Sequence, residues 1–215
     1  MSSDAADAVE PVEDGGTVLE VADLEKHFVK SAGWIESLFT DEERVRAVDG
    51  VSLSIERGEI FSVVGESGCG KTTLGKTLLR VVEPTAGRVT FDGQDLGALS
   101  RSEMQAMRRR MQIVYQDPFE SLNPKRTVYS LLEQPLDIHG IGSAAERRER
   151  IEGALRDVNL LPVEDFLDRY PEELSGGQLQ RVLFARPLVL DPDFIVADEP
   201  SSMLDASVRA RVLDL

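Results

Sequence analysis

The stretch GESGCGKTT, from Gly65 to Thr73, decides the fold of this chain. It matches the pattern G-x-x-x-x-G-K-[ST], and it follows an apolar run, EIFSVVG at 59–65, that is typical of a buried strand in a parallel sheet. A segment of helical periodicity, KTTLGKTLLRVV at 71–82, comes next. The order of strand, glycine-rich loop and helix predicts an α/β fold with a phosphate-binding loop. The alternative, a glycine-rich turn that only joins a strand to a helix, is disfavoured by the complete motif.

Each residue type in this loop has a physical role. Gly65, Gly68 and Gly70 let the backbone turn its N–H groups toward phosphate oxygens, and the start of the following helix adds the positive end of its dipole. Lys71 is expected to reach the β- and γ-phosphates, and the Thr72 hydroxyl is expected to bind Mg²⁺. The loop therefore predicts a nucleoside triphosphate as ligand.

A second apolar run, FIVADEP at 194–200, ends in two acidic residues. We expect Asp198 to hold the Mg²⁺ shell and Glu199 to accept a proton from the attacking water. The alternative is a strand end that is acidic by chance. The position of this acidic pair at the end of a predicted strand, after the lysine loop in the sequence, favours the catalytic interpretation.

A second glycine-rich turn, ELSGGQLQR at 173–181, precedes another predicted helix. Ser175 is a suitable N-cap, and free N–H groups at Gly176 and Gly177 would form a second anion site. A nucleotide that uses both sites would be held between the lysine loop of one copy and the Ser-Gly-Gly turn of a second copy related by a two-fold axis. A capped helix without a ligand remains the alternative.

The composition limits the partners. The chain has 215 residues with 39 acidic and 24 basic side chains, a formal net charge of -15, so its surface would repel nucleic acid. Few of the basic residues are lysine, which is compatible with a cytosol of high salt. Cys69 is the single cysteine, no run is long enough to span a membrane, and the N-terminus does not resemble a signal peptide. We expect a cytosolic protein that is recruited to membranes.

The predicted organisation is one domain over residues 17–215 after a mobile acidic segment at 1–16. Alternating strands at 17–24 and 46–59 predict an antiparallel β subdomain, with a polar excursion between them. Residues from about 117 to 181 are charged and helical in pattern and predict an inserted α-helical subdomain. The fold class is therefore an α/β P-loop NTPase core with a mixed or parallel sheet and these two subdomains.

The chain resembles the nucleotide-binding subunits of ATP-binding cassette (ABC) transporters from Thr17 to its last residue. LSGGQ at 174–178 is similar to the family's signature motif, and it lies between the lysine loop and VADEP as in that family. The resemblance implies an ATPase that couples hydrolysis to transport. It also implies roles for three further residues: Gln116 as the Q-loop glutamine, Phe28 as the aromatic residue that stacks on adenine, and Asp205 as the D-loop aspartate at the dimer interface.

Within the family, the excursion at 30–46, DPFESLNP at 117–124 and DPDFIVADEP at 191–200 resemble the ATPase subunits of dipeptide and oligopeptide importers, although some nickel importers share them. The resemblance implies ATP and Mg²⁺ as cofactors, and a homodimer or a heterodimer with a second ABC ATPase. It also implies membrane permease subunits, an indirect link to a solute-binding protein, no nucleic acid, and a place on the cytoplasmic face of the plasma membrane.

Several positions depart from the family pattern. The switch-loop histidine falls beyond Leu215, so the domain is expected to be C-terminally incomplete, and His27 and His139 are expected to be surface residues. Leu179 replaces a basic residue and Met203 an alanine, while Pro187 should kink or end a helix. These departures leave a second hypothesis, an ATP-binding module without effective hydrolysis. A soluble ABC ATPase acting on nucleic acid is a third, which the charge disfavours.

The predicted site comprises three groups of residues. The catalytic residues are Glu199, Lys71 and Gln116, and the metal is held by Thr72, Gln116 and, through water, Asp198. The nucleotide is bound by Phe28, Gly65, Glu66, Ser67, Gly68, Cys69, Gly70, Lys71, Thr72 and Thr73, and by Ser175, Gly176, Gly177 and Gln178 of the second copy.

Overall fold

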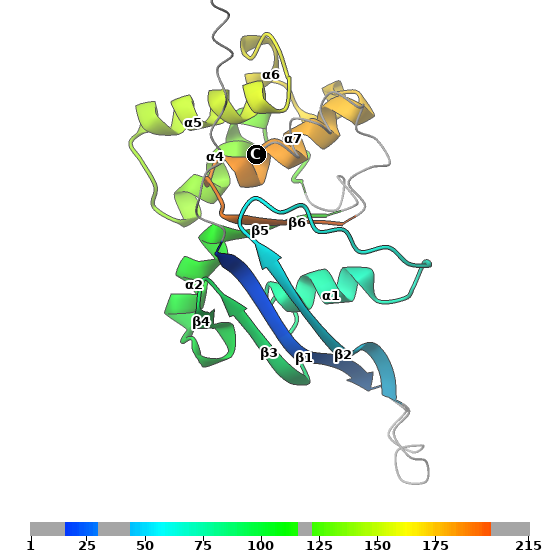
Figure 1. Ribbon diagram of the computed structural model, residues 1–215. Coiled ribbons are helices and arrows are strands. Elements are labelled where there is room, and N and C mark those ends of the chain that lie inside the picture. Colours follow the sequence, from blue (N-terminus) through cyan, green and yellow to red (C-terminus); the bar gives the residue numbers. More distant parts are fainter. Residues whose placement is uncertain (1–15, 30–43, 116–121, 199–215) are drawn as a thin grey trace, which may run out of the picture.

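The computed structural model describes residues 16–29, 44–115 and 122–198, which fall into three layers (Figure 1). An antiparallel sheet and two helices form the lower part of the view, a two-stranded parallel sheet crosses the middle, and a group of helices lies above it. The site residues lie mainly around the middle sheet, where the lower and upper parts meet.

The antiparallel sheet has the strand order β2-β1-β3-β4. Its members are β1 (Thr17–Val29), β2 (Arg44–Glu56), β3 (Ala86–Phe91) and β4 (Gln94–Asp95). The apolar residues of β1 turn toward the core: Leu19, Val21 and Leu24 are at most 3% exposed. The predicted antiparallel pairing of the strand that begins at Thr17 with the next predicted strand is confirmed.

Helices α1 (Lys71–Leu78) and α2 (Arg101–Arg110) cover the buried face of this sheet. Leu74 and Leu78 of α1 pack with Met104 and Met107 of α2 in the same core as the β1 side chains. A capping box between Ser100 and Glu103 starts α2, and a short 3-10 helix, η2 (Leu96–Ala98), precedes it.

The middle sheet pairs β5 (Met111–Val114) in parallel with β6 (Phe194–Ala197). The apolar run FIVADEP at 194–200 predicts β6, and the short run MQIVYQ at 111–116 predicts β5. The strand predicted at 59–65 is a wrong prediction: these residues form no strand and are exposed throughout. An apolar run becomes a strand only where a neighbour supplies backbone hydrogen bonds, and no described segment pairs with this one.

The upper part is helical, as the sequence pattern of residues 117–181 predicts. It contains α4 (Val128–Ile138), α5 (Ala144–Asp157), α6 (Glu164–Leu167), the 3-10 helix η3 (Pro171–Glu173) and α7 (Gly176–Leu188). Their apolar faces form a second core, in which Leu132, Ile151, Leu155 and Val182 are fully buried. The division of the chain at residues 16, 117 and 181 stays a prediction.

Candidate functional site

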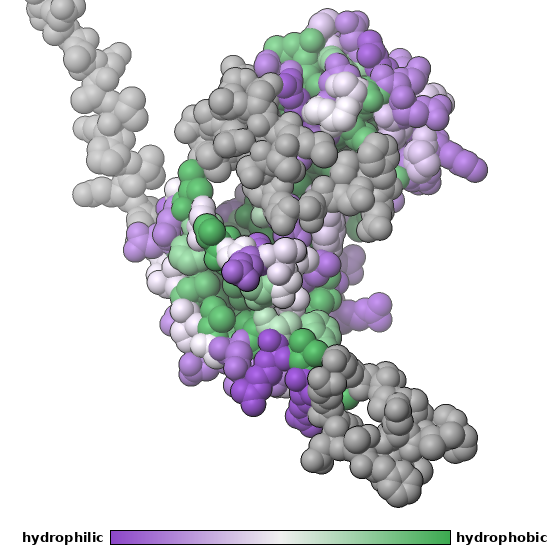
Figure 2. Space-filling model, turned by 90° about the vertical axis from the view of Figure 1, so that its right-hand side faces the viewer, coloured by the Kyte–Doolittle hydropathy of each residue, from purple (hydrophilic) through white to green (hydrophobic). Residues whose placement is uncertain are grey.

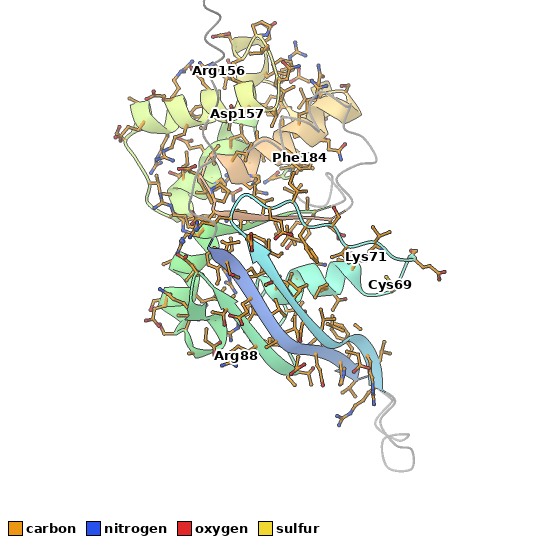
Figure 3. The ribbon with its side chains drawn as sticks, in the orientation of Figure 1. Cys69, Lys71, Arg88, Arg156, Asp157 and Phe184 are labelled. Atoms are coloured by element: carbon orange, nitrogen blue, oxygen red, sulfur yellow. The ribbon has the colours of Figure 1, made fainter. Side chains whose placement is uncertain are left out.

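The lysine loop ends at the first turn of α1, and its lysine folds back onto the loop itself. The Lys71 ammonium donates hydrogen bonds to the carbonyl oxygens of Gly65 and Glu66, both at 2.8 Å. Its Nζ also lies 3.8 Å from the Cys69 sulfur, and Figure 3 shows both side chains at the end of α1 that faces the loop. The loop thus curves around the positive charge of the Lys71 ammonium, to which a phosphate oxygen could also bind.

Gly70 sets the direction in which the loop enters α1. It is the N-cap residue, with a φ of 98° that L side chains rarely adopt, and a Cβ there would lie 2.0 Å from the carbonyl oxygen of Ala47. The loop is therefore pressed against β2, which only glycine permits. The first N–H groups of α1 have no partner within the helix and are free to bind an anion.

The predicted metal residues meet although 126 positions separate them. The Thr72 hydroxyl lies 2.7 Å and 3.0 Å from the two carboxylate oxygens of Asp198. Asp198 follows β6, and its backbone N–H donates to the carbonyl oxygen of Val114 at 3.0 Å, which fixes it at the carboxyl end of the parallel sheet. The hydroxyl of Thr72 and the carboxylate of Asp198 thus place two oxygen ligands of the kind that Mg²⁺ prefers at one point.

A residue that the sequence did not single out makes this meeting possible. Gly75 lies one turn after Lys71 in α1, and a Cβ there would approach Cγ1 of Val196 to 2.8 Å. The missing side chain lets α1 lie close against β6, so that Thr72 reaches Asp198. The sequence signal for this close contact is a glycine inside the helix that follows the loop.

Apolar side chains remain exposed directly before the loop. Ile60, Phe61, Val63 and Val64 are 44% to 93% exposed. Figure 2, which faces the side of the molecule on the right of Figure 1, shows apolar surface on that side. The exposure of these four side chains is the direct result of the unpaired segment at 59–65.

The Ser-Gly-Gly turn has the predicted N-cap. The Ser175 hydroxyl accepts from the Gln178 N–H at 3.3 Å, and the Gln178 side chain accepts from the Ser175 N–H at 3.0 Å. Leu179 is 1% exposed in a small core with Leu122 and Leu183, so an apolar residue suits this position. Pro187 lies inside α7, which ends one residue later at Leu188, so the expectation that the proline shortens or kinks the helix stays a prediction.

The two glycine-rich turns lie apart in the molecule. In Figure 1, α1 lies below the β5–β6 sheet and α7 above it. Sharing of one nucleotide between the turns of two copies stays a prediction.

Phe28 is compatible with its predicted role of stacking on adenine. Its ring is 41% exposed near the end of β1, and the Lys26 ammonium lies 5.0 Å from its centroid. An exposed ring with a cation on one face retains the other face for a base. Its contact with adenine stays a prediction.

The remaining predicted residues lie outside the part of the chain that the structure describes. These are Gln116, Glu199, Met203 and Asp205. Of the two histidines, neither is fully on the surface: His139 is half-buried, and the His27 side chain is only 14% exposed. The expectation of two surface histidines is therefore wrong, because His27 belongs to β1 and its side chain lies against Glu25 and Asp49.

A groove of about 260 Å³ opens beside β5, directly before Gln116. Its wall includes Tyr115 directly after β5, Ile138 at the end of α4 with His139 next to it, and Arg186 of α7. Burial, followed by the nearby Arg109 charge, holds the pKa of His139 below its usual value. Most of the residues that line the groove are apolar, and the lowered pKa favours the neutral form of the imidazole at one edge.

The lysine loop lies between β2 and α1, and the Thr72 hydroxyl contacts the Asp198 carboxylate at the end of a parallel strand. This arrangement defines a P-loop nucleotide-binding protein. Residues 48–202 match the family model described as ABC transporter. The chain therefore belongs to the ABC transporter family, as the LSGGQ resemblance implies.

Individual relatives agree with the family assignment. A putative peptide import ATP-binding protein from Brucella ovis is 49% identical over 92% of this chain, and the oligopeptide transport ATP-binding protein AppF from Bacillus subtilis is 45% identical over 93%. The chain spans 59% of the length of each of these relatives.

The solved structures agree with the predicted fold class. The dimeric structure of MJ0796, a bacterial ABC transporter cassette, superposes with a TM-score of 0.75 at 31% identity, over 90% of this chain and 79% of that one. A post-hydrolysis structure of the same cassette holds ADP and inorganic phosphate, with the same score and coverage. The α/β P-loop NTPase fold is confirmed. None of the described helices has the length and apolar character needed to cross a membrane.

Proposed function

We propose that this chain binds ATP with Mg²⁺ and hydrolyses it to energise a membrane importer of peptides. The single observation that carries the nucleotide chemistry is the contact between the Thr72 hydroxyl and the Asp198 carboxylate beside the lysine loop. The names of the relatives, which are peptide and oligopeptide import ATP-binding proteins, support the peptide substrate.

The donors beside the loop suit Mg²⁺. This ion prefers oxygen ligands, retains several waters, and is held in triphosphatases by few protein groups together with the phosphates. Thr72 supplies a hydroxyl, and Asp198 supplies a carboxylate that is aimed at the same point. When bound, the ion would neutralise charge on the β- and γ-phosphate oxygens.

The residues of the chain divide the chemistry among them. Lys71 would exchange its two loop carbonyl partners for phosphate oxygens and so stabilise the charge that develops on the transferred group. Water attacks the γ-phosphorus, the bond from this phosphorus to the β–γ bridging oxygen breaks, and ADP leaves. Glu199 takes the water proton, and Gln116 links this site to the transport subunits.

A second copy, or a second ABC ATPase, would complete the site. Its Ser175 turn would cover the γ-phosphate, and its Asp205 would act across the interface. The dimeric state of the MJ0796 cassette supports this arrangement. The groove beside Tyr115 is suited to an apolar segment of a permease subunit on the cytoplasmic face of the membrane, with a solute-binding protein beyond it.

Steady-state hydrolysis of Mg-ATP, measured against protein concentration in molar potassium salt, tests the proposal. We expect turnover to rise faster than linearly with concentration and to vanish in Glu199→Gln. Asp198→Asn should lose both turnover and the Mg²⁺ dependence of nucleotide binding. Asp157→Asn, at the exposed end of α5, is the matched control and should behave as the parent chain.

Two other outcomes would lead to the competing hypotheses. Tight ATP binding without turnover in the parent chain would favour a nucleotide-binding module and refute the ATPase. Salt-sensitive binding of nucleic acid would favour the soluble ABC ATPase. Turnover that is linear in concentration would refute a site shared between two copies.

A further inference from the structure

Three metal-ligating side chains converge near the end of the antiparallel sheet, and none of them belongs to the residues predicted to bind the nucleotide. Glu25 and His27 belong to β1, and Asp49 belongs to β2. One carboxylate oxygen of Glu25 lies 3.6 Å from Nε2 of His27, and one of Asp49 lies 3.5 Å from the same nitrogen. All three ligand atoms lie within 4.8 Å of one another.

The backbone explains why these residues meet. Glu25 and His27 are two positions apart on β1, so their side chains leave the same face of the strand. The pairing of Lys26 with Val48 brings Glu25 beside Asp49 on the neighbouring strand. Shifts of the register on both sides of Lys26 then bring His27 over the same point.

The arrangement is poorly satisfied without a cation. Two carboxylates beside each other on adjacent strands repel, and Arg46, whose nearest approach to Asp49 is 3.3 Å, is 67% exposed and weakens this repulsion only in part. Nε2 of His27 is buried and makes no hydrogen bond within the described residues. A buried nitrogen that makes no hydrogen bond, although two carboxylate oxygens lie within 3.6 Å of it, is suited to bind a metal ion together with them.

The distances suit a small transition metal. Zinc binds imidazole nitrogen and carboxylate oxygen at about 2.0–2.2 Å, so two ligands at a tetrahedral angle are about 3.4 Å apart. The two measured separations from His27 are close to this value. A neutral imidazole favours zinc and its neighbours over Mg²⁺ or Ca²⁺, which prefer oxygen alone.

We propose that Glu25, His27 and Asp49 form a binding site for Zn²⁺ or a chemically similar divalent ion, with water as the fourth ligand. The ion would tie β1 to β2 one residue before Phe28. It would replace the repulsion of the two carboxylates by a shared positive partner. The site is separate from the Thr72–Asp198 pair and does not depend on the proposed hydrolysis.

Zinc titration of the chain without nucleotide, by competition with a chromophoric chelator, tests the site. The Cys69→Ser background removes the one thiol, and millimolar Mg²⁺ occupies sites made of oxygen alone. We expect one Zn²⁺ per chain, and an affinity that falls at least about tenfold in His27→Gln. His139→Gln is the matched control, because it removes the only other histidine and should bind as the parent does.

Two further measurements keep the proposal open to refutation. Asp49→Asn changes a side chain that is 53% exposed, so it should fold normally and still lose zinc affinity. Co²⁺ should give a visible absorption band in the parent that His27→Gln lacks, at equal circular dichroism. No zinc binding by the parent, or equal losses in His27→Gln and His139→Gln, would overturn the site.

Discussion

The replacement of Leu179 by alanine tests whether this residue anchors the Ser-Gly-Gly turn. Leu179 lies one turn into α7, is 1% exposed, and packs with Leu122, Leu131 and Leu183 in a small core of its own. The alanine variant removes three carbon atoms from this core. Because the core is small, few neighbours can move to fill the space.

The magnitude follows from the burial. Removal of three buried carbon atoms costs about 2.4 kcal/mol in transfer free energy, at about 0.8 kcal/mol for each. The cavity adds to this, and a loss of about 3 to 4 kcal/mol in the free energy of unfolding is expected. Ile138→Ala removes the same number of carbon atoms from a helical residue that is 60% exposed, and it should cost less than about 1 kcal/mol.

Urea unfolding followed by circular dichroism measures both variants. The two denaturation slopes should agree, so that the difference in midpoint reports the difference in stability. The reasoning would be refuted if Leu179→Ala lost no more stability than Ile138→Ala. That result would mean that Leu179 is not packed as described and that the basic residue usual in importers would be tolerated there.

Three further predictions concern the backbone, a charge network and a helix cap. Gly70→Ala should lower the melting temperature and the affinity for ATP, because its Cβ would clash with the carbonyl oxygen of Ala47. Gly153→Ala, in open space within α5, should instead raise the free energy of unfolding by about 0.5–1 kcal/mol. Calorimetry of both variants measures the difference. Hydrogen bonds from Arg110, then Arg57, hold the pKa of Asp92 below the ordinary value of an aspartate. Their stabilisation is fully present above that ordinary value and is lost as the pH falls through the lowered pKa, so Asp92→Asn should flatten the acid side of the stability profile in urea titrations. Ser175→Ala should cost about 1 kcal/mol in thermal unfolding by removing the cap of α7, and Ser175→Thr should retain most of it.

The agreement between pattern and structure differs from one element to another. The helices α4 and α5 and the cap at Ser175 were predictable because their signals are local: apolar spacing, capping residues and charge within a few positions. The strand that the sequence predicts at 59–65 does not form, although its apolar run is as clear as those of β5 and β6. A strand also needs a partner, and no local pattern supplies one.

The sequence by itself was enough to predict the chemistry of the site. Lys71, Thr72 and Asp198 could be proposed as ligands of phosphate and Mg²⁺ because these ligands require such groups at such positions relative to a strand and a helix. Only the tertiary structure decided which distant groups meet. Gly75 lets α1 approach β6 so that Thr72 contacts Asp198, and a shifted register between β1 and β2 places His27 between two carboxylates. Both depend on close packing and strand register between segments far apart in the chain, which residue spacing does not encode.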